Sequence, residues 1–263
     1  MKLDMYQVDA FSKKAFGGNP AAVCPLDEWL PDELMQSIAL ENQLSETAFF
    51  VREGNEFHLR WFTPAFEIDL CGHATLASAH VLYQHLGYKG SIVFHTRSGP
   101  LYVEQEGAKY FMKLPSRPPE KATGPANVVE ALGIKPIESR ISRDYFFVFE
   151  SEQQIRDMQP NLDLIYKWEE VVGVTVTAPG VNSDFVSRFF APRALVNEDP
   201  VTGSAHCNLV PYWAEKLGKK KLYAEQLSAR YGELFCEDLG EQISLGGNAV
   251  TFFKGTVDLS SVL

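Results

Sequence analysis

Residues 60–75 read Arg-Trp-Phe-Thr-Pro-Ala-Phe-Glu-Ile-Asp-Leu-Cys-Gly-His-Ala-Thr, and residues 188–206 repeat the same order of residue types. Each copy has an arginine, two aromatic residues, a proline, acidic residues and then a glycine that opens an apolar helix. The arginine and the glycine are Arg60 and Gly72 in the first copy, and Arg188 and Gly203 in the second. A repeat half a chain apart predicts two related domains, and the matched helix starts predict one shared site.

Alternating and apolar stretches on both sides of each copy predict the surrounding elements. We expect strands at 48–51, 57–62, 173–178, 184–190 and 227–231, and helices at 74–86 and 204–217. The basic run at 219–221 is interpreted as a solvated helix end. Clustered prolines at 115–119 predict the linker, so the expected domains are residues 1–115 and 120–263, with an alternative in which the last strand joins the N-terminal domain.

The composition limits the classes of function. The chain has 263 residues, 45% of them hydrophobic, and a net charge of −10. Because the only dense basic run is three lysines long, we expect no nucleic-acid partner. Four cysteines without a CxxC pair favour reduced thiols and a cytoplasmic location. No apolar run approaches about 18 residues, so we expect no membrane segment.

The two glycine-led helix starts are candidate anion-binding turns. Backbone N–H groups at a helix start lack intrahelical partners and suit a carboxylate or phosphate. A single such turn is usually an ordinary helix start. Two in register within one repeat favour a shared site, with Gly72 in one turn and Gly203 and Ser204 in the other.

Glu46 precedes an apolar strand, Ala48–Val51. Partial desolvation would favour the protonated form of its carboxyl group and suit it to proton transfer, although composition alone favours a solvent-facing glutamate at a strand edge. His73 and His206 follow the two glycines. Each fits an acid/base role, substrate hydrogen bonding or, for His206, an ordinary helix histidine. Asp199 is a candidate because of its place in the repeat.

Cys71 lies just before Gly72, where a helix N-terminus can lower the pKa of a thiol. The matching position in the second copy is Thr202, so the repeat contains no pair of thiols. Histidines and cysteines show no compact metal-ligand spacing, and we expect no metal site. The sequence has no GxGxxG, Walker or GxSxG motif, which weakens nucleotide, flavin and serine-hydrolase hypotheses.

Five blocks of the sequence, taken in order between residues 16 and 206, resemble the PhzF-like (phenazine biosynthesis) isomerase family. They are Phe16-Gly-Gly-Asn-Pro-Ala-Ala-Val23, Leu44-Ser-Glu-Thr-Ala-Phe49, Arg60-Trp-Phe-Thr-Pro64, Asp69-Leu-Cys-Gly-His-Ala-Thr-Leu76 and Glu198-Asp-Pro-Val-Thr-Gly-Ser-Ala-His206. The resemblance implies an α+β (mixed α/β) fold similar to diaminopimelate epimerase. In that fold two pseudo-symmetric domains each wrap a mixed β-sheet around a central helix, and the active site lies in the cleft between them.

The resemblance also implies a cofactor-free isomerase that shuttles protons, often as a homodimer. The family's acid/base glutamate falls on Glu46, and its supporting polar residues fall on His73 and Asp199. Its substrate-contacting turns fall on Gly72, Gly203 and Ser204. We therefore expect Glu46 to move a proton on a small carboxylate-bearing substrate that these turns hold.

Two alternatives stay open. In the first, the protein is a racemase or epimerase and Cys71 is one of its two bases. Diaminopimelate epimerase has a cysteine at both turns, whereas this chain has Cys71 at one and Thr202 at the other. In the second alternative, the protein is not an enzyme and binds a small acid or a partner protein. The sequence does not identify the substrate.

Overall fold

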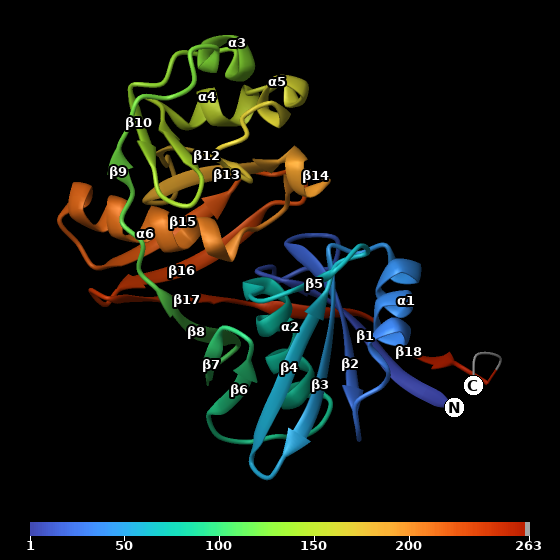
Figure 1. Cartoon of the computed structure of the whole chain (residues 1–263). Helices are drawn as coiled ribbons and strands as arrows, with labels where there is room; N and C mark the ends of the chain where they lie inside the picture. Colours follow the sequence, from blue (N-terminus) through green and yellow to red (C-terminus); the bar gives the residue numbers. More distant parts are fainter. Residues whose placement is uncertain (261–263) are drawn as a thin grey trace. The chain divides into compact units, whose positions relative to one another are not determined.

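The structure is a computed structural model, and it describes residues 1–260. The chain divides into two compact units (Figure 1). Unit 1 comprises Met1–Lys113 and the chain from Gly246 onward, and unit 2 comprises Leu114–Leu245. Each unit is a mixed β-sheet with helices packed on it, which is the mixed α/β class that the family resemblance implies. Strand β17 (Gln242–Gly247) connects unit 2 to the returning segment of unit 1.

Unit 1 is built on strands from both ends of its sequence. They are β1 (Lys2–Ala10), β2 (Asn19–Leu26), β3 (Glu46–Glu53), β4 (Glu56–Phe62), β5 (Glu67–Ile68), β6 (Ile92–Thr96), β7 (Gly99–Glu106), β8 (Lys109–Pro115) and β18 (Ala249–Asp258). Strand β1 pairs antiparallel with both β18 and β2. Strand β2 runs parallel to β3, β3 antiparallel to β4, and β4 parallel to β6 and antiparallel to β5. Strands β6, β7 and β8 continue as an antiparallel meander.

Helix α2 (Gly72–Gln84) is the central helix of unit 1 (Figure 1). All residues from His73 to Leu82 are buried, because the helix packs against β1, β2, β3 and β18. Its sequence is small or apolar on most faces, as such an enclosed helix requires. Helix α1 (Asp32–Asn42) covers β3 and β4 from outside, burying Met35, Ile38 and Ala39.

Unit 2 repeats this plan. Its strands are β9 (Glu120–Lys121), β10 (Glu138–Ile141), β11 (Tyr145–Val148), β12 (Val174–Pro179), β13 (Phe185–Ala191), β14 (Val196–Asp199), β15 (Lys221–Gln226) and β16 (Gly232–Asp238). Its helices are α3 (Val128–Leu132), α4 (Glu152–Asp157), α5 (Leu162–Tyr166), the 3-10 turn η1 (Pro192–Ala194) and α6 (Gly203–Leu217). Helix α6 is the central helix, buried throughout Ala205–Ala214.

The strand pairings of the two units correspond. Strand β11 runs parallel to β12, β12 antiparallel to β13, and β13 parallel to β15 and antiparallel to β14. This is the order of β2, β3, β4, β6 and β5 in unit 1. Strands β4 and β13 therefore carry the arginines of the repeat, and α2 and α6 follow its glycines. The sequence repeat reflects a repeated topology.

The arginine and first acid of each copy form a bidentate ion pair, between β4 and β5 in unit 1 and between β13 and β14 in unit 2. Arg60 donates to Glu67 at 2.8 and 2.7 Å, and Arg188 donates to Glu198 at 2.7 and 2.9 Å. In each unit, two parallel hydrogen bonds fix both side chains and join the strand of the arginine to the segment that leads into the central helix. The arginine and glutamate that recur in both copies thus form a structural clamp in each unit, Arg60 with Glu67 and Arg188 with Glu198.

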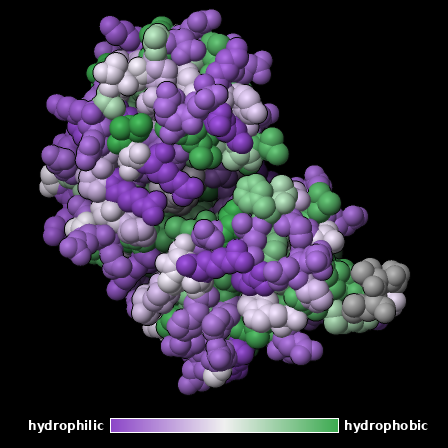
Figure 2. Space-filling view, viewed as in Figure 1, coloured by the Kyte–Doolittle hydropathy of each residue, from purple (hydrophilic) through white to green (hydrophobic). Residues whose placement is uncertain are grey.

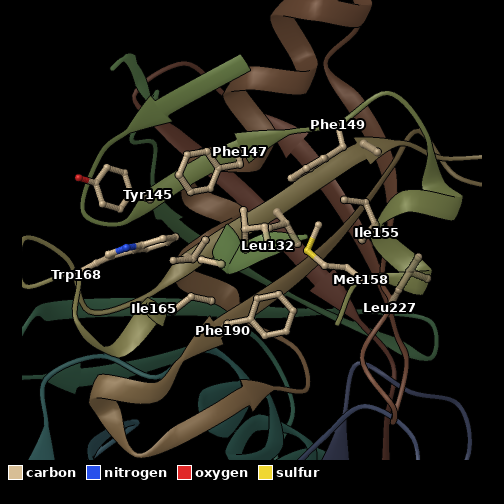
Figure 3. Close-up of a cluster of buried hydrophobic side chains, with 14 of the residues drawn as sticks. Leu132, Tyr145, Phe147, Phe149, Ile155, Met158, Ile165, Trp168, Phe190 and Leu227 are labelled. Carbon is tan, nitrogen blue, oxygen red and sulfur yellow. The ribbon is translucent and has the colours of Figure 1, made fainter. Parts of the chain in front are cut away.

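A hydrophobic core lies between the sheet of unit 2 and its helices α3–α5 (Figure 3). Trp168 packs edge-on against Tyr145 and Phe147, with ring centroids 5.8 and 6.2 Å away. Large aromatic side chains of this kind contribute most of the buried area in such a core. In unit 1 a corresponding cluster beneath α1 contains Cys24, Phe49 and Phe62.

The strand expected at 227–231 is wrong. Strand β15 ends at Gln226, and a turn follows in which Tyr231 has a φ of 58° and its N–H donates to Ser228 O at 3.1 Å. The lysine run at 219–221 is likewise not part of the helix. Gly218 ends α6 in the left-handed conformation, and Lys221 is the first residue of β15.

In the view of Figure 2, hydrophilic residues cover most of the surface of each unit, with small hydrophobic patches among them. Within residues 1–260, no helix has the length and apolar character needed to cross a membrane.

Candidate functional site

Three elements of unit 1 bring polar side chains together at the start of the central helix. Asn19 is the first residue of β2, and Glu46 is the first residue of β3. Because β2 and β3 are parallel, with Ala21 opposite Glu46, both strands begin at the same edge of the sheet. Cys71 and His73 lie at the N-terminus of α2.

The imidazole of His73 is the centre of this group, and it is almost fully buried. Its Nε2 atom lies 2.9 Å from Glu46 Oε2, whose side chain is 15% exposed. On the other side of the ring, Nδ1 lies 3.2 Å from Asn19 Nδ2 and 3.5 Å from Cys71 Sγ. A carboxylate with a small exposed fraction therefore stands in direct contact with a buried imidazole.

The charges of this group are coupled. Burial raises the pKa of the Cys71 thiol to about 11, and the charge of Glu46 adds to this shift. The thiol is therefore protonated at neutral pH. Burial by itself would lower the pKa of His73, but Cys71 and Glu46 beside the ring raise it well above its usual range. Because the thiol carries no charge at neutral pH, Glu46 is the partner that holds a proton on His73.

Glu46, Cys71 and His73 also form the one group of potential metal ligands among residues 1–260, with ligand atoms within 4.8 Å of one another. Glu46 and Cys71 approach opposite nitrogens of the His73 ring. The three titratable side chains thus lie in a row, with the His73 ring between Glu46 and Cys71.

The loop before Asn19 depends on a glycine at position 18. Gly18 has a φ of +62°, and a Cβ atom there would lie 2.0 Å from the carbonyl oxygen of Ala10. Only glycine fits this position. Asn19 follows with its side chain fully buried.

The second copy of the repeat forms a different polar group in unit 2. Asp199, the last residue of β14, accepts a hydrogen bond from Thr202 Oγ1 at 2.5 Å. Gln226, the last residue of β15, accepts one from the backbone N–H of Thr202 at 2.9 Å. Thr202 precedes α6 as Cys71 precedes α2.

Neither central helix has a side-chain cap at its N-terminus. The backbone donors of the first turn are those of Gly72 and His73 in α2, and of Gly203 and Ser204 in α6. Such donors stabilise negative charge. This is the physical basis for the substrate-binding role expected at both turns.

His206 lies one turn into α6 and does not join the polar group. It is fully buried, its Nδ1 lies 2.8 Å from the carbonyl oxygen of Thr202, and its ring is 6.0 Å from that of Phe185. Burial lowers its pKa to about 4. His206 is therefore neutral at pH 7, as an ordinary helix histidine would be.

The residues predicted from the sequence thus form two groups. Glu46, Gly72 and His73 lie together in unit 1, and Asp199, Gly203 and Ser204 lie together in unit 2. Sequence reasoning assigned no role to Asn19 and Gln226. Asn19 lies within the Phe16–Val23 block of the family resemblance, which could have singled it out, whereas Gln226 lies in no motif.

Comparisons with known proteins place this geometry in context. Residues 8–255 match the family model described as phenazine biosynthesis-like protein, PhzC-PhzF. A relative from Pseudomonas aeruginosa, named as an uncharacterized isomerase, is 49% identical, and the match covers 99% of this chain and 100% of the relative.

Solved structures of similar fold lead to the same family. A phenazine biosynthesis protein of the PhzF family from Enterococcus faecalis superposes with a TM-score of 0.97 at 46% identity, covering 98% of this chain and 100% of that one. A structure described as a predicted epimerase from Pseudomonas aeruginosa has a TM-score of 0.77 at 19% identity, covering 97% and 99%. The second likeness concerns the fold alone, and it confirms the epimerase-like fold expected from the motifs.

Proposed function

Because this chain belongs to the phenazine biosynthesis-like (PhzC-PhzF) family, as its motifs predicted, we propose that it is a cofactor-free isomerase that moves a proton on a small carboxylate-bearing substrate. The isomerase class is supported by the name of its Pseudomonas relative, which matches along nearly the whole chain. The substrate class and the acid/base residue are our own inference from the site.

One observation carries the proposal: the 2.9 Å contact between Glu46 Oε2 and His73 Nε2 at the start of α2. Glu46 is exposed enough to meet a ligand, since 15% of its side chain remains accessible. His73, Cys71 and Asn19 are buried. The His73 ring contacts Glu46 through Nε2, and Asn19 and Cys71 through Nδ1. A positioned carboxylate with an imidazole that can exchange protons is a suitable acid/base centre.

In the proposed reaction, Glu46 removes a proton from a carbon next to the substrate's carboxylate or carbonyl group. The electron pair of the broken C–H bond moves onto that group and gives an enolate-like anion. Backbone N–H groups at the start of α2 stabilise the developing charge. The proton then returns to another carbon or to the opposite face, so the reaction consumes no co-reactant.

The second copy offers complementary chemistry. The N–H groups of Gly203 and Ser204 are suited to a second anionic group of the substrate. Asp199 would orient the substrate or relay a proton, and its carboxylate is fixed by Thr202 at 2.5 Å. A homodimer and a cytoplasmic location belong to the same proposal, and light scattering on the purified protein tests the first of them.

The test uses a panel of small α-amino and α-hydroxy acids in heavy water, with exchange of carbon-bound protons followed by NMR. We expect at least one compound to exchange with the wild-type protein and not with Glu46→Gln. Glu56→Gln is the matched control, because Glu56 also pairs with a histidine, His95, but at a surface where half of its side chain is exposed. Wild-type exchange rates in Glu46→Gln would refute the assignment of Glu46.

The racemase alternative, in which Cys71 is a base, is disfavoured by its burial and raised pKa. The non-catalytic alternative predicts binding of a panel compound without exchange. Calorimetry on the same panel separates it from the proposal, because a binder that never exchanges its proton would support the non-catalytic function.

A further inference from the structure

The buried side-chain amide of Gln226 makes three hydrogen bonds to the turn of the second copy. Its Oε1 atom accepts from the backbone N–H of Thr202 at 2.9 Å. Its Nε2 atom donates to the carbonyl oxygen of Asp199 at 2.8 Å and to Thr202 Oγ1 at 3.1 Å. The side chain is fully buried, so water does not compete for these contacts.

One backbone group fixes the direction of every bond in this network. A backbone N–H can only donate, so the oxygen of the Gln226 amide must face Thr202 N, and its NH₂ must face Thr202 Oγ1. A hydroxyl that receives a hydrogen bond from this side turns its own proton elsewhere. In this structure the proton points to Asp199 Oδ2, 2.5 Å away.

We infer that Gln226 is a positioning residue for Asp199. It holds the Thr202 hydroxyl as a donor and thereby keeps Asp199 Oδ2 as an acceptor, with the carboxylate in one orientation. The importance of that orientation for catalysis rests on the proposed function. The hydrogen-bond polarity does not, because it follows from unit 2 alone.

Two charged residues next to this network have partners of their own. Glu198, adjacent to Asp199 on β14, is paired with Arg188 on β13. Glu225, adjacent to Gln226 on β15, accepts a hydrogen bond from Tyr231. A change at residue 226 would reach Asp199 through the Thr202 hydroxyl and through the hydrogen bond of Gln226 to the carbonyl oxygen of Asp199.

The test is a pH titration of the Asp199 carboxyl carbon by ¹³C NMR in the full-length protein without any ligand, with Asp199→Asn to assign the signal. Gln226→Glu preserves shape and the acceptor for Thr202 N–H, but it replaces the NH₂ donor by a second oxygen. We expect a carboxyl of the resulting pair to titrate about one pH unit or more above wild-type Asp199. Gln242→Glu, which adds the same charge on the exposed start of β17, should leave Asp199 unchanged.

Thr202→Val and Thr202→Ser provide a second measurement that holds if Gln226→Glu fails to fold. Valine removes the donor and should raise the titration midpoint of Asp199, whereas serine keeps the hydroxyl and should restore the wild-type value. Equal midpoints in wild type, Gln226→Glu and Thr202→Val would overturn the inference, as would a valine variant that matches the serine one. Because the titration needs no substrate, it can succeed even if Glu46→Gln shows that the proposed reaction is wrong.

Discussion

The residue before the helix-opening glycine is Cys71 in the first copy of the repeat and Thr202 in the second. Both positions precede a buried central helix, and both copies carry the same bidentate arginine–glutamate clamp. The polar groups at the two turns nevertheless differ. Cys71 lies beside an imidazole–carboxylate pair, whereas Thr202 donates to a carboxylate and is held by an amide. The framework is duplicated, and the chemistry is not.

This difference shows which features of the repeat belong to the fold. The arginine, the aromatic residues and the glutamate recur because they hold the strand against the segment that leads into the helix. The residues at and after the helix start differ between the copies, and they contact different side chains in the two units.

The largest expected difference between the copies is catalytic. Glu46→Gln should lower proton exchange on a panel substrate by roughly 100-fold or more, because it removes the proposed base. Asp199→Asn should lower it by roughly tenfold, because an amide still occupies the site but no longer accepts from Thr202 in the same way. NMR exchange rates in heavy water measure both. Equal losses in the two variants would indicate a matched pair of bases instead.

The two clamps should differ in their contribution to stability. Arg188 is nearly buried and also donates to the carbonyl oxygens of Ile155 and Met158, at 3.2 and 2.7 Å. Arg188→Met should therefore lower the free energy of unfolding by about 3–4 kcal/mol.

In the first clamp the arginine is more exposed, 19% for Arg60 against 10% for Arg188, and Glu67 also contacts Arg97 at 2.6 Å. Because Arg97 remains after the substitution, Arg60→Met should cost only about 1 kcal/mol. Urea unfolding followed by tryptophan fluorescence compares the two variants. A first-copy variant that is as unstable as the second would show that Arg97 does not compensate.

The helix histidines should respond to pH with opposite signs. His206 has a folded-state pKa lowered to about 4, so the unfolded chain binds a proton first as the pH falls. Its contribution to stability is lost between about pH 6.5 and 4, by about 3 kcal/mol in total. His73 has a raised pKa, so its contribution is present below about pH 6.5 and is lost as the pH rises through the folded-state value.

Unfolding free energies of the wild type and His206→Asn at several pH values test the first of these signs. The variant should lose less stability than the wild type on acidification. A parallel pH dependence in the two proteins would contradict the burial of a neutral His206. His80 in α2, whose pKa burial also lowers to about 4, remains in both proteins and so cancels in the difference.

The smallest expected effect is that of Cys71→Ser. The thiol is protonated at neutral pH and 3.5 Å from His73 Nδ1, where a hydroxyl can make a similar contact. Exchange rates should change by less than about threefold. A loss comparable to that of Glu46→Gln would favour the racemase alternative and would make the two turns chemically equivalent after all.

Local sequence predicted much of the fold and part of the candidate site. Gly72 and Gly203 opened helices as expected, since a helix start depends on a few neighbouring residues. The strand expected at 227–231 failed because β15 begins three residues after the helix-ending Gly218, at Lys221, and ends at Gln226, so that the turn falls at residues 228–231. A pattern of apolar residues does not by itself locate that boundary.

The sequence by itself determined the family, the internal repeat and the residue types at both helix starts, because these are carried by spacing along the chain. Only the tertiary structure decided which side chains meet. Glu46 reaches His73 because β3 lies beside the start of α2, and Gln226 reaches Thr202 because β15 runs parallel to β13. Contacts between residues 24 or more positions apart depend on strand register and chain closure, and no local motif records them.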